Sequence, residues 1–254
     1  MKKLLQIIDI FEIKITTILL FVLSAIFGQF KMIMLYFIVA FIHEFFHLLM
    51  CFVLKVKVEK FQILPFGASL TVKEIEGLSS NKQLLIYIAG PFSALINIVV
   101  FLVLKNNNII NIVNYNYLRR YNYLMCLLNL LPIYPLDGYM IIKAILQKIL
   151  VYKKAMKISI IISVVSYIIF ALSNIYCFQP MILFFLLIEQ SKNVLEYKNI
   201  YKKFLIDKSL NKRKKKYKII NDYSMYKEVN NYKLEANKIL DDKQIASIEL
   251  KRYI

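Results

Sequence analysis

The second apolar segment of the chain contains the run His43-Glu44-Phe45-Phe46-His47, which includes both histidines of the protein. Residues four apart lie on one face of an α-helix, about 6 Å apart along its axis, so both imidazoles can bind one metal ion. Glu44, turned by about 100° from His43 around that helix, can reach a metal-bound water without being a ligand. Imidazole and carboxylate groups suit zinc, so the pattern predicts a catalytic zinc site.

A catalytic zinc needs a third protein ligand and one open position. Because the chain has no third histidine, we considered the acidic residues at the ends of apolar segments, Asp137 and Glu189. Asp137 follows two prolines that interrupt the helix and free backbone carbonyls. It could equally form a turn or cap the next helix. Glu189 is expected to lie in water at the membrane interface. Residue types alone therefore leave the third ligand open, with Asp137 the better candidate.

The composition predicts an all-α polytopic membrane protein. Hydrophobic residues make up 59% of the 254 residues, more than a soluble domain can bury. Two imidazoles and a carboxylate within lipid cost several kcal/mol unless they are satisfied, which favours a functional site over an inert polar patch. The three cysteines lie in apolar runs and are expected to be small buried side chains. About six segments can span a membrane, near residues 15–30, 32–54, 84–104, 117–135, 158–173 and 175–188.

The positive charges predict the orientation in the membrane. Of the 34 Lys and Arg residues, 30 fall on the side that holds both termini in the six-span arrangement. The positive-inside rule then makes both termini cytoplasmic in a multi-pass protein of the cell membrane. The opposite side receives Lys31, Lys105, Arg119 and Arg120. The net charge of +18 follows this distribution, so we expect no nucleic-acid partner.

Three segments outside the spans are expected to have structure of their own. Residues 1–14 are predicted to form an amphipathic segment, a helix lying on the membrane. Residues 55–83 begin with alternating apolar residues and predict a short cytoplasmic β-hairpin. Residues 139–157 contain five lysines and predict a basic interfacial helix. Residues 15–191 then form the transmembrane core.

Residues 192–254 are predicted to form a small basic cytoplasmic tail, which includes five consecutive basic residues at 212–216. Two interpretations stay open. A solvated basic segment would bind anionic lipid. Alternatively, the tail is a docking surface for a substrate domain or a regulatory partner, with a strand over 217–222 and a helix over 234–240.

Two stretches resemble the signatures of the site-2 protease family, which are intramembrane zinc metalloproteases. These are His43-Glu44-Phe45-Phe46-His47 and the stretch Asn129 to Gly138. Pro65-Phe66-Gly67 and Ala89-Gly90-Pro91 are similar to weaker family stretches. The short six-span plan, the basic tail and the lack of a PDZ insertion most resemble the sporulation branch, which cleaves a membrane-tethered sigma-factor precursor.

The resemblance implies a role for each matching residue. His43, His47 and Asp137 would ligate Zn²⁺, and Glu44 would be the general base that activates a zinc-bound water. Asn129 would position the substrate or polarise its carbonyl. The hairpin around Phe66 would present an edge strand to an extended, membrane-tethered protein substrate. Regulatory membrane partners are also expected.

The chain departs from the family at three positions where glycine is common, namely Phe46, Ala68 and Tyr139. None of them removes a catalytic group. The sporulation branch carries a nucleotide-responsive CBS-type domain in its tail. Residues 217–254 are too short for a full pair of CBS motifs, so we assign no nucleotide site. Two alternatives to the protease stay open. One is an inactive membrane scaffold of the same family, and the other is a metal transporter, although transporters usually spread their polar residues over several spans.

Overall fold

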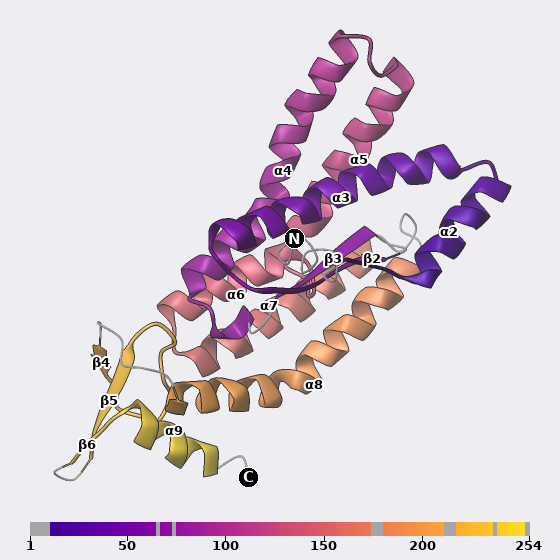
Figure 1. Cartoon of the computed structure of the whole chain (residues 1–254). Helices are drawn as coiled ribbons and strands as arrows, with labels where there is room; N and C mark the ends of the chain where they lie inside the picture. Colours follow the sequence, from indigo (N-terminus) through magenta and orange to yellow (C-terminus); the bar gives the residue numbers. More distant parts are fainter. Residues whose placement is uncertain are drawn as a thin grey trace. The chain divides into compact units, whose positions relative to one another are not determined.

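The computed structural model describes residues 11–64, 67–72, 75–173, 180–210, 217–235 and 238–251. The chain is mostly helical, with two small sheets, which confirms the predicted fold class (Figure 1). The helices are α2 (Ile15–Ile26), α3 (Phe30–Val53), α4 (Ser80–Asn106), α5 (Ile112–Leu130), α6 (Asp137–Ile149), α7 (Tyr152–Ser173), α8 (Pro180–Leu210) and α9 (Asp242–Lys251).

Within the described residues, three helices are long and apolar enough to cross a membrane, namely α3, α4 and α7. The shorter helix α2 is apolar as well. These helices support the predicted membrane location, while the number of six spans stays a prediction. Part of the last predicted span, residues 174–179 with Cys177, lies outside the described residues. Helix α8 extends well beyond that span, to Leu210, so the predicted tail begins as helix.

The predicted β-hairpin within residues 55–83 is confirmed. Strands β2 (Val58–Leu64) and β3 (Gly67–Val72) are antiparallel, with Val58 opposite Val72 and Leu64 opposite Gly67. The turn residues 65–66, which include Phe66, lie outside the described part. Strand β3 packs against α3, the helix that contains both histidines. The hairpin therefore lies beside the candidate metal-binding helix.

The predicted helix over residues 1–14 is wrong for Phe11–Ile13, which form strand β1, parallel to β2. Glu12 accepts hydrogen bonds from Lys60 at 2.9 Å and from Gln62 at 2.6 Å, both on β2. These interactions with a distant strand outweigh the helical pattern of the local sequence. Residues 1–10 lie outside the described residues.

The chain divides into two units, and the first comprises residues 1–75 and 85–130. In this unit α3 packs against α5, around a buried cluster of Leu35, Val39, Phe101 and Leu118. The second unit comprises residues 76–84 and 131–254. Its largest cluster combines the start of α7, the end of α8 and the C-terminal segment, and includes Tyr152, Tyr201, Leu205, Met225 and Ile245.

The C-terminal segment is folded rather than a solvated tail. Strand β4 (Tyr217–Ile219) confirms part of the predicted strand and pairs in parallel with β5 (Asn230–Glu235). The predicted helix over 234–240 is wrong, because β6 (Lys238–Leu240) pairs antiparallel with β5. Helix α9 starts only after Asp241, whose carboxylate accepts hydrogen bonds from the amides of Lys243 and Gln244. The basic run 212–216 lies outside the described residues.

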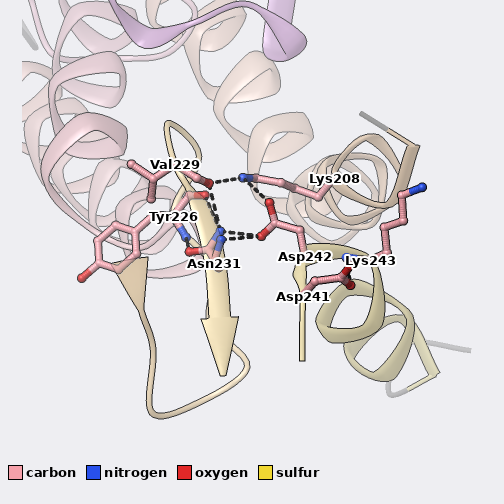
Figure 2. A network of polar contacts seen from close by, with 7 residues as sticks. All are labelled: Lys208, Tyr226, Val229, Asn231, Asp241, Asp242 and Lys243. Carbon is pink, nitrogen blue, oxygen red and sulfur yellow. Dashed lines mark hydrogen bonds and ion pairs between the residues drawn. The ribbon is translucent and has the colours of Figure 1, made fainter. Parts of the chain in front are cut away.

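A buried polar network holds this segment on the end of α8 (Figure 2). Asn231 is fully buried, accepts from the amide of Tyr226 at 2.8 Å, and donates to Asp242 at 2.9 Å. Lys208 of α8 donates to the carbonyl of Val229 at 2.6 Å and lies 3.4 Å from Asp242. The loop before β5, the strand itself and α9 are thus connected to α8.

The predicted basic interfacial helix over 139–157 is divided between α6 and the start of α7, and one of its lysines is buried. Lys143 is 5% exposed and forms an ion pair with Glu76, which also accepts from the Tyr152 hydroxyl at 3.1 Å. Burial alone would raise the pKa of Glu76, but the positive charges of Lys143 and Lys227 outweigh it and lower that pKa. Lys143 therefore stabilises the protein interior and is not available to lipid.

Replacing Asn231 by Ala is expected to loosen the C-terminal segment, because it removes the acceptor of the part-buried Tyr226 amide and a hydrogen bond to Asp242. Such a loss costs about 1–3 kcal/mol, so amide hydrogen exchange in 217–251 should become about 5- to 150-fold faster. The exposed Asn221→Ala is the matched control. Equal exchange in both variants would contradict the network.

Candidate metal centre

Helix α3 places both histidines on its buried face. His43 is 4% exposed and His47 is 5% exposed, on the same face as Val39, Ala40 and Cys51. Glu44 is half-buried, one position further around the helix. The sequence therefore folds as its spacing predicts, with both imidazoles on the buried face of α3 and the carboxylate of Glu44 beside them.

The two imidazoles lie at a separation that suits a metal ion. Nε2 of His43 and Nε2 of His47 are 3.3 Å apart. Two nitrogen ligands at about 2.0–2.1 Å from a tetrahedral zinc would be separated by about 3.3–3.4 Å. One ligand atom each from His43, Glu44 and His47 all lie within 4.8 Å of one another. These groups fit a zinc ion without rearrangement of the two rings.

A backbone carbonyl orients the second histidine. Nδ1 of His47 lies 2.7 Å from the carbonyl oxygen of Ile86 on α4. Because a carbonyl can only accept, Nδ1 carries the proton and Nε2 presents its lone pair toward His43. Ring nitrogens that face away from a metal usually donate in this way, which holds the ring and makes it a better ligand.

Gly90 of α4 provides the room for both rings. A Cβ atom at this position would lie 2.6 Å from Nε2 of His43 and closer still to Nε2 of His47. Any larger residue would have to displace the imidazoles. Ser93 donates to the Gly90 carbonyl at 2.6 Å, on the buried face of the same helix. Ile86 and Gly90, one turn apart, thus form the wall against which the two histidines rest.

Asp137 is the first residue of α6 and is 9% exposed. The N-cap residue is Leu136, so the alternative in which Asp137 caps the helix is wrong. The preceding loop is held by the Tyr134 amide, which donates to Ser163 at 2.8 Å, and by Ser163, which donates to Gln190 at 2.7 Å. Asp137 belongs to the second unit and the histidines to the first. The role of Asp137 as a zinc ligand stays a prediction.

The other residues singled out in the sequence have local partners. Asn129, near the end of α5, is half-buried and donates to the Met125 carbonyl at 3.0 Å. Its predicted role toward substrate is not tested by this contact. Glu189 forms an ion pair with Lys192 at 2.6 Å, and its position at a membrane interface stays a prediction.

Two of the departures from the family pattern can be located. Tyr139 is 1% exposed and accepts a hydrogen bond from Asn193 of α8 at 3.1 Å, so it forms part of the packing between α6 and α8. Phe46 is half-buried next to His47. The side chain of Ala68 lies outside the described part.

Sequence reasoning missed Ile86, because it contributes only a carbonyl, a group that every residue has.

Replacing Gly90 by Ala is expected to push the imidazoles apart and to weaken metal binding while the helices remain folded. Zinc per chain, measured in detergent-purified protein, should fall well below that of wild type. Gly77→Ala is the matched control, since a Cβ there meets no atom within 4 Å. Unchanged zinc content in Gly90→Ala would show that the rings do not bind metal at this wall.

Comparison with known proteins gives the following similarities. No family model matches the chain. A zinc metalloprotease of Methanocaldococcus jannaschii is 34% identical over 128 residues, which cover 49% of this chain and 37% of that protein. Stage IV sporulation protein FB of Bacillus subtilis is 25% identical over 133 residues, 52% of this chain and 46% of that protein. The chain thus spans less than half the length of the curated relatives it matches.

A solved structure extends the similarity to most of the chain. The site-2 protease from Methanocaldococcus jannaschii matches with a TM-score of 0.55 and 28% identity. The match covers 72% of this chain and 89% of that one. Together with the two curated relatives, it shows that the chain is similar to site-2 proteases in sequence and in fold.

Proposed function

We propose that the protein is an intramembrane zinc metalloprotease that hydrolyses a peptide bond of a membrane-tethered protein. The observation that carries this proposal is the pair of Nε2 atoms 3.3 Å apart on α3, beside Glu44. Nδ1 of His47 contacts the Ile86 carbonyl, and the Nε2 atoms of both histidines lie next to Gly90, which leaves room for one ion between them. Two buried imidazoles with a neighbouring carboxylate within an apolar helix are costly unless they serve a function.

His43, His47 and Asp137 are proposed to hold zinc. Two neutral imidazoles and one carboxylate form a common ligand set of catalytic zinc, with one position left open. Zinc, when bound, supplies a Lewis acid that lowers the pKa of water and polarises a carbonyl. Asp137 is supported by its burial and by its place at the start of α6, after a loop held by hydrogen bonds.

Glu44 is proposed to act as the general base. Glu44 follows His43 directly on the helix, and its carboxylate lies within 4.8 Å of a ring nitrogen of each histidine. From this position it can take a proton from the attacking water. The same carboxyl group would then pass the proton to the leaving amine. Asn129 is proposed to position the substrate or to polarise the scissile carbonyl, since its side-chain amide is only half-buried.

The sheet beside α3 suggests how the substrate is held. A peptide bond inside a helix is protected by its hydrogen bonds, so the substrate must be extended before cleavage. In the sheet order β1-β2-β3, strand β3 has β2 on one side and no other strand of the described residues on the other. Because β3 also packs on α3, an extended substrate added to its open edge would lie beside the histidines.

The proposal also includes a substrate class and an orientation in the membrane. Similarity to a stage IV sporulation protein supports a role in sporulation. A sigma-factor precursor is proposed as the substrate because the sequence resembles the sporulation branch of the family. The distribution of basic residues supports a multi-pass arrangement with both termini cytoplasmic. The basic residues at 212–216 are proposed to contact anionic lipid, and regulatory membrane proteins are further expected partners.

Glu44→Gln is expected to bind zinc as wild type does but to lose cleavage by about 10²- to 10⁴-fold, the usual contribution of a general base. The measurement is cleavage of a co-expressed membrane-tethered substrate, together with zinc per chain. Glu196→Gln, at an exposed position of α8, is the matched control. Cleavage at the wild-type rate would exclude Glu44 as the base, and no cleavage by wild type would favour the inactive-scaffold alternative.

Asp137→Ala is expected to weaken zinc binding by more than the about 10- to 100-fold that loss of an outer-shell partner costs. The check is a competition titration with a zinc chelator on detergent-purified protein. Asp222→Ala removes a carboxylate at an exposed position and serves as control. Equal zinc affinity in the two variants would mean that another residue is the third ligand.

A further inference from the structure

A cavity of about 790 Å³ lies between α4 and α5, wholly within the first unit. Ala94, Leu95 and Ile98 of α4 line it on one side. On the other side is the face of α5 that includes Arg119, Arg120 and Tyr123. This cavity, called the α4–α5 groove below, involves none of the residues that we propose for zinc binding or catalysis.

The floor of the groove offers no polar group that needs a ligand. Asn122 is buried and donates to the Ala94 carbonyl at 2.9 Å, and its oxygen accepts from Asn97 at 2.9 Å. The walls, in contrast, are apolar and open, since Leu95 is 61% exposed and Ile98 is 51% exposed. An apolar chain can therefore enter the groove without breaking a hydrogen bond.

One end of the groove is strongly positive. Asn116, Arg119, Arg120 and Tyr123 follow the spacing i, i+3, i+4, i+7, so they form one stripe along α5. Arg119 and Lys105 both lie against the ring of Tyr115, with their charges 5.9 Å and 5.0 Å from its centre. Arg119 and Lys105 thus meet at Tyr115, and Arg120 lines the groove next to Arg119.

These cations have no acidic neighbour in sequence. The chain has no Asp or Glu between Glu76 and Asp137, a stretch that includes all of α4 and α5. Among the described residues, Arg119 and Arg120 form no ion pair with a protein carboxylate. Arginine is costly inside a bilayer unless its guanidinium reaches the interface or an anion. An anionic ligand at this point would remove that cost.

We propose that the α4–α5 groove is a binding site for an anionic phospholipid. The phosphate is bound by Arg119 and Arg120, whose planar guanidinium groups match phosphate oxygens. One acyl chain runs along the open walls formed by Leu95 and Ile98. In the proposed arrangement with both termini cytoplasmic, Lys105, Arg119 and Arg120 lie on the outer side, so the lipid comes from the outer leaflet.

The change along the groove from charged to apolar favours a lipid over a protein partner. Along α5 the lining runs from Asn116 and the two arginines, through the amphipathic Tyr123, to Cys126. A phospholipid has the same order, from a charged head through an ester region to a hydrocarbon chain. A transmembrane helix with one carboxylate would satisfy the arginines but would not follow an apolar channel between two helices.

The test is lipid retention and stabilisation of the full chain purified in detergent. Short-chain phosphatidylglycerol should raise the melting temperature more than phosphatidylcholine with the same chains, and glycerol phosphate without chains should have no effect. The double variant Arg119→Gln/Arg120→Gln should weaken phosphatidylglycerol binding at least about tenfold. The control Lys202→Gln/Lys203→Gln removes two charges from α8 and should retain wild-type binding.

A second variant tests the apolar part separately. Ile98→Trp fills the groove at an exposed wall position and keeps both arginines, so it should also reduce lipid retention, measured by native mass spectrometry. Equal binding of both lipids by wild type, or equal loss in the arginine and lysine double variants, would overturn the proposal. So would unchanged lipid retention in the arginine variant, the result expected if a carboxylate of a partner helix is the natural occupant.

Discussion

The contact between α3 and α4 is the constraint on which the candidate metal centre depends. Nδ1 of His47 donates to the Ile86 carbonyl over 2.7 Å, and Gly90 leaves room for both rings one turn further along α4. Without the carbonyl the ring of His47 could rotate, and without the glycine neither ring could reach its position. The metal-binding geometry is therefore a property of two packed helices rather than of the His43–His47 sequence alone.

The second unit has a different organisation, in which polar groups join segments far apart in the sequence. Glu76 binds Lys143 and Tyr152, and the amide of Ser80 at the start of α4 donates to Glu228 at 2.6 Å. The C-terminal segment thereby binds the beginning of α4 and the end of α8. Because α6 begins at Asp137 in the same unit, these contacts also stabilise the surroundings of the proposed third ligand.

Several features could be predicted from sequence because they depend on local spacing. The positions of His43 and His47 on one helical face follow from a separation of four residues, and the hairpin of β2 and β3 follows from alternation between apolar and polar residues. The apolar helices follow from composition. In each case the decisive interactions lie within one element or between neighbours in the chain.

The wrong predictions concern residues whose partners are distant. Residues 11–13 pair with residues of β2 that lie fifty positions away in the sequence, and no local pattern reveals that partner. Lys143 belongs to a charged series typical of an interface, yet it is buried because Glu76 neutralises it. The C-terminal segment is polar enough to suggest a solvated tail, but the buried Asn231 holds it together.

The central claim is that His43, His47 and Asp137 bind one zinc ion, and X-ray absorption at the zinc edge tests it most directly. The wild-type protein should show two imidazoles and only nitrogen or oxygen ligands. Asp137→Cys should keep both imidazoles and gain a sulfur ligand at about 2.3 Å. A zinc-loaded Asp137→Cys protein whose spectrum matches that of wild type would contradict the three-ligand site.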